Sequence, residues 1–316
     1  MKATPAAIPV DLKSPGQVLA CMGFLEAAEV LLGGVEAHFD WSAAQAKFVL
    51  RRAECDKNPF EVVLEFLAKA KIIELTPMGY VEGGAADADD DGEGATPDEP
   101  EDGDESGDPG ESQERVTTPA FPAGEGDRNA LPIQLAADGF RLPVSHWADG
   151  SSREPFKLYS GNRSARLIAS NMIEAVRSLW TTKQPNLLKA PLDQVMPIKG
   201  KFNFDPRGGW VAIDAGYSPK EQGHGVDTSP VVELLAAIGL EHTRPIVVVT
   251  TDAELLRKTL YGRATYAVWG QSLPPMLARA ALVDAALNVP KRRFSFDLRA
   301  SGKNKVTTFA QEATQL

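Results

Sequence analysis

The sequence predicts an α+β fold in which two folded blocks flank an acidic insert. Residues 1–81 carry the element order β-α-β-β-α-β, which is the ferredoxin-like pattern. Residues 82–128 contain almost no large apolar side chain. Residues 129–316 mix strands and helices without a strict β-α-β rhythm, and such a mixture favours an α+β domain over a doubly wound parallel sheet.

A nearly all-apolar helix over 14–32 is the predicted centre of the first block. Ser14 is a good N-cap, and Pro15 suits the first helical position, where its missing N–H costs nothing. Gly33 and Gly34 end the helix. Because strongly polar side chains are few along it, we expect most of its circumference to be buried.

The other elements of the first block follow from hydrophobic alternation and from helix-start signals. A short strand at 8–12 precedes the central helix. After it come two antiparallel strands, a helix opened by Asn58 and Pro59, and a closing strand; the three strands are at 38–41, 47–50 and 72–75. Many RNA-binding modules share this order, although a fold alone does not establish a function.

The second block is predicted from the same signals. We expect a strand, a long helix, a hairpin, a second helix, two further strands, a third helix and a closing strand pair. In chain order these lie at 157–159, 163–180, 201–205 with 210–214, 229–239, 246–250, 266–269, 274–287, and 293–299 with 306–309. The run at 246–250 consists of apolar residues, so we expect a buried strand there.

The net charge of −10 hides a basic globular part. Residues 82–114 hold 15 acidic and no basic side chains, so the rest of the chain has a net charge of +5. Residues 129–316 alone carry a net charge of +7. A segment as polar as 82–128 cannot bury enough surface to offset its ordering entropy, and we expect it to be disordered. It is either an inert linker or a tethered polyanion that competes for the basic surface.

No catalytic or metal-binding motif is present, and we expect a non-enzymatic protein without a cofactor, metal or small-molecule substrate. The histidines are scattered; His224, in a glycine-rich loop, is the one best placed to reach a phosphate. Cys21 and Cys55 make no disulfide framework. The N-terminus lacks a signal-peptide core and no apolar run predicts a membrane span, so we expect a cytoplasmic location.

Three basic groups are the candidate nucleic-acid-binding residues. In chain order they are Lys157 with Arg163 and Arg166; Lys199, Lys201 and Arg207, interleaved with Phe202 and Phe204; and Lys291, Arg292 and Arg293, with Arg299, Lys303 and Lys305 nearby. The first surrounds a helix N-terminus, which offers free N–H groups to an anion. The second suits backbone contacts with base stacking, provided that the phenylalanines face solvent. The alternative for each group is a solvated basic face.

Four stretches of the chain resemble a family of CRISPR-associated proteins of subtype I-G, formerly I-U. The first, Ile8 to Ala28, reads I-P-V-D-L-K-S-P-G-Q-V-L-A-C-M-G-F-L-E-A-A. The others are F-K-L-Y-S-G-N-R-S at 156–164, I-D-A-G-Y-S-P at 213–219, and V-V-E-L-L-A-A-I-G-L-E-H-T-R-P at 231–245. They are packing and turn motifs, not catalytic signatures, and they span most of the chain outside the acidic segment.

The resemblance implies a subunit of a crRNA-guided interference complex, also called Cascade, in antiviral defence. We therefore expect a non-catalytic component that binds crRNA or target DNA and contacts neighbouring effector subunits, with a large-subunit-like role as the first choice. Two alternatives remain open. One is a metal-independent endonuclease that processes crRNA with His224 as the acid–base residue. The other is a protein–protein adaptor without nucleic-acid contact.

Overall fold

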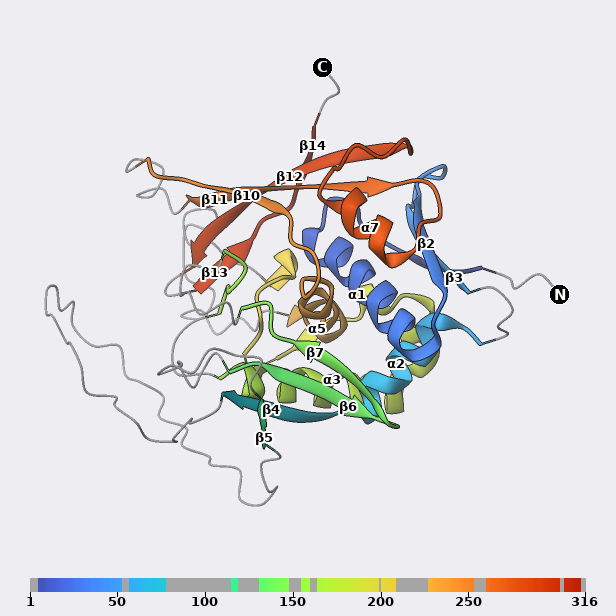
Figure 1. Cartoon of the computed structure of the whole chain (residues 1–316), viewed down its shortest axis with the longest axis vertical. Coiled ribbons are helices and arrows are strands. Elements are labelled where there is room, and N and C mark those ends of the chain that lie inside the picture. The colour runs from blue at the N-terminus through green and yellow to red at the C-terminus, as the bar shows by residue number, and fades with distance from the viewer. Residues whose placement is uncertain are drawn as a thin grey trace, which may run out of the picture.

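The computed structural model describes residues 5–52, 57–77, 115–118, 131–147, 155–159, 164–198, 200–208, 227–252, 260–301 and 304–313. Within these ranges it is a mixed α+β protein with five α-helices and several small, mainly antiparallel sheets (Figure 1). The helices are α1 (Pro15–Leu32), α2 (Pro59–Lys69), α3 (Ala165–Lys189), α5 (Pro230–Gly239) and α7 (Pro275–Leu282). The α+β fold class is thereby confirmed.

The strands form four sheets. The first has the order β1-β3-β2, from Ala6–Pro9, Lys47–Arg52 and Val35–Asp40. The second has the order β5-β4-β6-β7, from Arg115–Thr118, Lys71–Pro77, Ile133–Ala137 and Phe140–Val144. The third has the order β10-β11-β12-β13, from Ile246–Val249, Leu260–Trp269, Lys291–Ser301 and Asn304–Thr307, with β14 (Gln311–Glu312) also on β12. The small fourth sheet pairs β8 (Met196–Pro197) with β9 (Asp227–Thr228).

The first block has the predicted element order β-α-β-β-α-β, but its strands do not form one ferredoxin-like sheet. Only β1, β3 and β2 pair with one another. The closing strand β4 instead pairs antiparallel with β6 of the second block, with Ile72 opposite Leu135. Pro9 is one reason, because a proline lacks the N–H that a second neighbour would need and so favours an edge position for β1.

Part of the predicted insert is a strand. Arg115–Thr118 pairs in parallel with Glu74–Pro77, so the prediction of disorder for 82–128 is wrong at these four residues. Val116, Thr117 and Thr118 are β-branched, and such residues suit a pleated strand. The rest of the insert lies outside the described residues.

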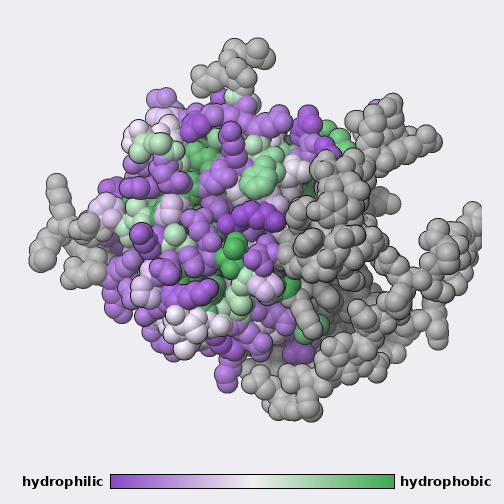
Figure 2. Space-filling view, turned by 180° about the vertical axis from the view of Figure 1, so that it is seen from behind, coloured by the Kyte–Doolittle hydropathy of each residue, from purple (hydrophilic) through white to green (hydrophobic). Residues whose placement is uncertain are grey.

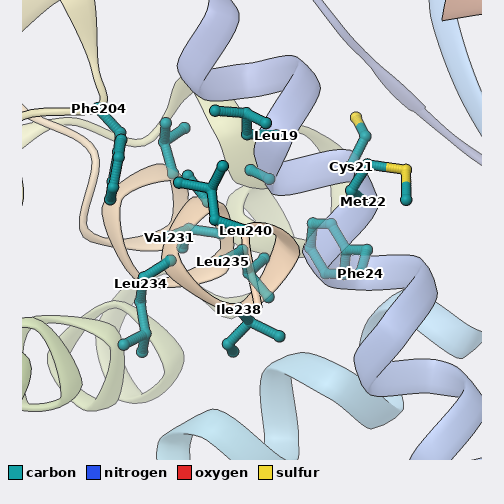
Figure 3. Close-up of a cluster of buried hydrophobic side chains, with 14 of the residues drawn as sticks. Leu19, Cys21, Met22, Phe24, Phe204, Val231, Leu234, Leu235, Ile238 and Leu240 are labelled. Atoms are coloured by element: carbon teal, nitrogen blue, oxygen red, sulfur yellow. The ribbon is translucent and has the colours of Figure 1, made fainter. Parts of the chain in front are cut away.

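The two blocks share one hydrophobic core, and its centre is the contact between α1 and α5 (Figure 3). The helix backbones touch because glycine occupies the contact points. A Cβ atom on Gly23 would lie 2.0 Å from the carbonyl oxygen of Leu235, and one on Gly239 would lie 2.3 Å from that of Leu19. Fully buried leucine and valine side chains of both helices, together with Phe24 of α1, then surround this approach.

The central helix matches its prediction in both its limits and its burial. Ser14 caps it, with its hydroxyl accepting the N–H of Gln17, and Gly33 ends it. Residues 15–28 are all buried. By length and composition α1 could cross a membrane, and it is the one such helix in the described part of the chain. Its position between α5, α2 and the sheets accounts for the apolar composition (Figure 1).

Several elements of the second block differ from the sequence prediction. No strand forms at 157–159, where the backbone bond from Lys305 to Leu158 is not part of a ladder, and the helix expected at 274–287 ends at Leu282. Helix α3 continues past residue 180 to Lys189, across a kink at Lys183 that precedes Pro185. Strand β10 is not buried: it forms the edge of its sheet, and Ile246, Val248 and Val249 are exposed. An apolar run alone does not distinguish a central strand from an edge strand, which explains the error at β10.

One contact between α3 and α2 has no counterpart in the sequence prediction. Arg177 donates from Nε to the carbonyl of Ala68 at 2.9 Å and from Nη2 to the carbonyl of Ala70. These carbonyls lie at the C-terminus of α2, where backbone acceptors have no partner within the helix. Arg177 therefore caps α2 and fastens it to α3.

The described part of the surface seen from the opposite side of Figure 1 is mainly hydrophilic (Figure 2). Its hydrophobic residues lie in small separate patches over the described part of that face. Scattered apolar side chains of this kind are normal for a folded domain and do not by themselves mark a site.

We predict that Gly23→Ala destabilises the protein. Alanine improves helix propensity by about 1 kcal/mol, but its methyl group would overlap the backbone of Leu235, which cannot rotate away. We expect a net loss of about 1–3 kcal/mol in the free energy of unfolding, measured by urea denaturation. Val30→Ala, at an exposed position of the same helix, is the control and should change stability by less than about 0.5 kcal/mol. Equal effects at the two positions would contradict close α1–α5 packing.

Candidate functional site

Three segments of the chain meet at the carbonyl oxygen of Leu158. They carry Lys157 of the first basic group, Lys201 of the second, and Lys305, which belongs with the third. This oxygen accepts the backbone N–H of Lys305 at 2.8 Å and the side-chain amide of Asn203 at 3.5 Å. The segment 155–159 therefore lies between residues 200–205 and strand β13. Sequence positions more than 100 residues apart are brought together here.

Two lysines at this point lie over aromatic rings. The Nζ atom of Lys305 is 4.3 Å from the ring centroid of Tyr261, and that of Lys157 is 5.6 Å from the ring of Tyr159. Tyr261 lies in a register irregularity of β11, between Leu260 and Gly262, where the strand departs from regular pairing with β12. The Tyr159 ring is buried in the aromatic core, whereas Tyr261 and Lys305 are half-buried, and a cation–aromatic pair of the second kind suits the backbone and the bases of a single-stranded nucleic acid.

Arg299 is the least compensated arginine that the structure describes on β12. Its Nη2 atom lies 3.4 Å from Oδ2 of Asp297, whose Oδ1 already accepts from Arg263 Nε at 2.8 Å. Its buried Nε atom has no hydrogen-bond partner among the described residues. Arg299 lies opposite Val306 in the ladder, whereas Lys305 lies opposite Ala300, so the side chains of Arg299 and Lys305 point to opposite faces of the sheet. Arg299 is therefore not part of the group around Leu158. We define Lys157, Tyr261 and Lys305 as the basic–aromatic surface.

The neighbouring basic residues of β12 have strong partners within the protein. Arg292 donates to both oxygens of Glu312, at 2.7 and 2.6 Å, and this contact lowers the pKa of Glu312. Arg293 donates to Asp284 at 2.6 Å, and Lys291 donates to the carbonyl of Ala285. A phosphate would have to displace these partners, so this part of the third group is a poor anion site.

The stacking interpretation of the second group is wrong. Phe202 and Phe204 are 1% and 0% exposed, and they pack in the core against an aromatic cluster that includes Trp147 and Tyr159. The predicted strand at 201–205 is absent, and its partner at 210–214 lies outside the described residues. Apolar rings at alternate positions fit a core strand and an exposed platform equally well, and the sequence pattern does not distinguish them.

The charges of the second group have internal partners. Arg207 holds Asp205 with a pair of contacts, Nε to Oδ1 at 2.9 Å and Nη2 to Oδ2 at 2.8 Å, and it also donates to the carbonyl of Leu192. Lys201 donates to the carbonyl of Gly208, and burial lowers its pKa. Lys201 and Arg207 therefore stabilise a turn, while Lys199 lies outside the described residues.

The predicted anion site at the start of α3 is only partly described. Arg166 lies in the first turn of the helix and is half-buried, whereas Arg163 lies outside the described residues. The hydroxyl of Ser164 accepts the N–H of Leu167 at 3.2 Å, so one of the free N–H groups already has a partner. The helix end thus remains a prediction.

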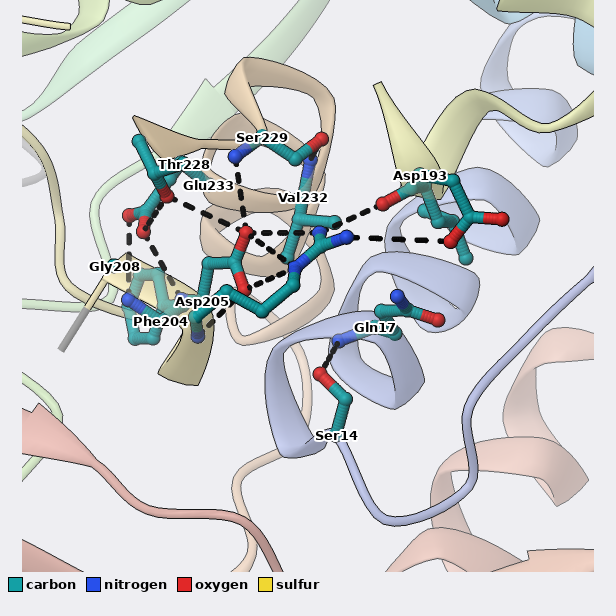
Figure 4. Close-up of polar contacts among 12 residues, drawn as sticks. Ser14, Gln17, Asp193, Phe204, Asp205, Gly208, Thr228, Ser229, Val232 and Glu233 are labelled. Atoms are coloured by element: carbon teal, nitrogen blue, oxygen red, sulfur yellow. Dashed lines mark hydrogen bonds and ion pairs between the residues drawn. The ribbon is translucent and has the colours of Figure 1, made fainter. Parts of the chain in front are cut away.

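A buried carboxylate pair fixes the turn at 203–208 to the start of α5 (Figure 4). Glu233 accepts the backbone N–H of Phe204 at 3.2 Å and that of Asp205 at 3.0 Å. Asp205 accepts the N–H of Ser229 at 2.9 Å and is neutralised by Arg207. Complete burial raises the pKa of Glu233 to about 7. Nothing in the sequence pairs these two acids, because the turn and the helix are far apart along the chain.

The histidines give no described catalytic centre. His146 is buried between Trp147 and Phe204, and burial lowers its pKa to about 3, so its ring is neutral. His38 contacts the hydroxyl of Ser272 at 3.0 Å. His224 lies outside the described residues. No group of three or more potential metal ligands occurs in the described ranges.

Comparison with known proteins finds no match among family models, curated proteins or solved structures.

We predict that Glu233 lowers the stability of the protein as the pH rises from about 5 to 7. Folding raises its pKa from 4.5 to about 7. The folded state therefore holds a proton that the unfolded state has released, and the stabilisation is complete below pH 4.5 and lost by about pH 7. His146 acts in the opposite direction, because folding lowers its pKa, so the comparison must be made with a variant.

The variant is Glu233→Gln, which cannot titrate. Relative to wild type, its free energy of unfolding should rise by about 1–3 kcal/mol between about pH 5 and pH 7.5, measured by urea denaturation at each pH. Parallel pH profiles for the two proteins would show that Glu233 stays ionised in the core.

Proposed function

We propose that this protein is a non-catalytic subunit of a type I CRISPR interference complex, and that it binds crRNA or target DNA through the basic–aromatic surface. The observation that carries the proposal is that the segments bearing Lys157 and Lys305 meet at the carbonyl of Leu158, with Lys305 over the half-buried ring of Tyr261. Lysine donors suit phosphates, and an aromatic ring beside them suits a base. The resemblance to subtype I-G proteins supplies the biological setting.

The sequence motifs of the resemblance agree with this arrangement. The stretch at 156–164 contains Lys157 and Leu158, and the stretch at 8–28 supplies the central helix. Neighbouring effector subunits would contact other faces of the molecule. The protein would act in antiviral defence in the cytoplasm. A large-subunit-like role within the complex is part of the proposal, as is the absence of a catalytic site.

The proposal predicts weaker nucleic-acid binding when positive charges are removed from the basic–aromatic surface. Lys157→Ala combined with Lys305→Ala should weaken binding to unrelated single-stranded sequences by similar factors, because phosphate contacts carry no sequence information. The slope of log affinity against log salt should decrease by about 0.7–0.9 for each phosphate that the variant no longer neutralises. Fluorescence anisotropy with labelled RNA and DNA over a salt series measures both effects.

Arg292→Ala combined with Arg293→Ala is the matched control, because it also removes two positive charges. These two arginines already have carboxylate partners, so affinity and salt slope should change little. A larger effect in the control pair would move the site to the other end of β12. Incubation of wild type with repeat RNA separates the alternatives: cleavage would favour the endonuclease, and the absence of any nucleic-acid binding would favour the adaptor.

A further inference from the structure

Strand β10 is an exposed edge without the protection that edge strands usually have. It ends the order β10-β11-β12-β13, and no described strand pairs with its other side. Ile246, Val248 and Val249 are 56%, 71% and 46% exposed. The strand Ile246–Val249 contains no charge, proline or bulge, which are the usual features that keep an edge from pairing with another chain.

The hydrogen bonds of β10 show which backbone groups face the open side. Thr250 donates its N–H to the carbonyl of Tyr261 at 3.1 Å, so it faces β11. Since alternate residues of an antiparallel strand face the same neighbour, Val248 and Ile246 also direct their N–H and C=O groups to β11. Val247 and Val249 therefore direct theirs to the open edge. The described residues offer them no backbone partner.

We propose that β10 pairs with β10 of a second copy of this chain, antiparallel, about a two-fold axis that passes Val248. Val247 of each copy then lies opposite Val249 of the other, and these residues exchange the backbone hydrogen bonds that the edge leaves open. Val248 lies opposite Val248 of the second copy in a non-hydrogen-bonded pair, where side chains approach most closely. The most exposed apolar side chain of the strand is thereby covered.

The charges that flank β10 select this register, and they favour a second copy of this chain over a strand of a different protein as the partner of the open edge. In the proposed pairing Arg244, which precedes β10, lies opposite Asp252, which follows it, and the two-fold axis repeats this pair. A shift of two residues in either direction separates Arg244 from Asp252. No like charges face one another within the strand, because Ile246–Val249 is uncharged. The edge is thus complementary to itself, as an isologous interface requires.

Cysteine cross-linking tests the register. In a Cys55→Ser background, where Cys21 is buried, Val248→Cys should form a disulfide-linked dimer under mild oxidation, because opposed non-hydrogen-bonded residues have Cα atoms within disulfide range. Ile246→Cys is the control and should stay monomeric on a non-reducing gel, because Thr250 of the second copy lies opposite. Equal cross-linking of the two variants, or none with Val248→Cys, would overturn the proposal.

Light scattering after size exclusion tests the association itself. The full-length wild-type chain should be dimeric at high concentration, and Val248→Lys should be monomeric because two ammonium groups would meet at the axis. Thr265→Lys adds the same charge to an exposed position on β11 and should remain dimeric. A wild-type chain that is monomeric at every concentration overturns the proposal. It does so even if a strand of a different protein is found to pair with this edge.

Discussion

The backbone contact between α1 and α5 is the constraint on which the rest of the structure depends. Glycine at positions 16, 23 and 239 removes the side chains that would hold the packed segments apart. Because the axes approach so closely, the flanking leucine and valine side chains interdigitate from both helices and exclude water. The two blocks of the sequence are one packing unit for this reason, although an acidic segment of low apolar content separates them along the chain.

The position of the candidate surface follows from that contact through a short series of hydrogen bonds. Glu233, in the first turns of α5, holds the backbone of Phe204 and Asp205. The carbonyl of Phe204 accepts from Thr307 at 2.8 Å, which fixes the end of β13. The neighbouring Lys305 then meets Leu158. A change at the helix contact would therefore displace cationic groups that never touch either helix.

Local signals in the sequence predicted what depends on local structure. Ser14 with Pro15, Asn58 with Pro59 and Ser229 with Pro230 each mark a helix start that the structure contains, because capping involves neighbouring residues only. What depends on distant partners was not predictable. The pairing of β4 with β6, the burial of both phenylalanines, and the capping of α2 from α3 all join separate parts of the chain. For the same reason the sequence could nominate basic groups but not say which of them had carboxylate partners.

The distance along the chain between α1 and α5 has a consequence for synthesis. About 200 residues separate the two helices, so α5 leaves the ribosome long after α1 has done so. During that interval an eighteen-residue helix with apolar residues on nearly every side is covered only by the early elements α2, β2 and β3, and the face that α5 covers stays open. Chains released before α5 is made would expose this face of the helix and aggregate through it. The yield of heterologous expression would then depend on the incomplete chain and not on the stability of the finished fold.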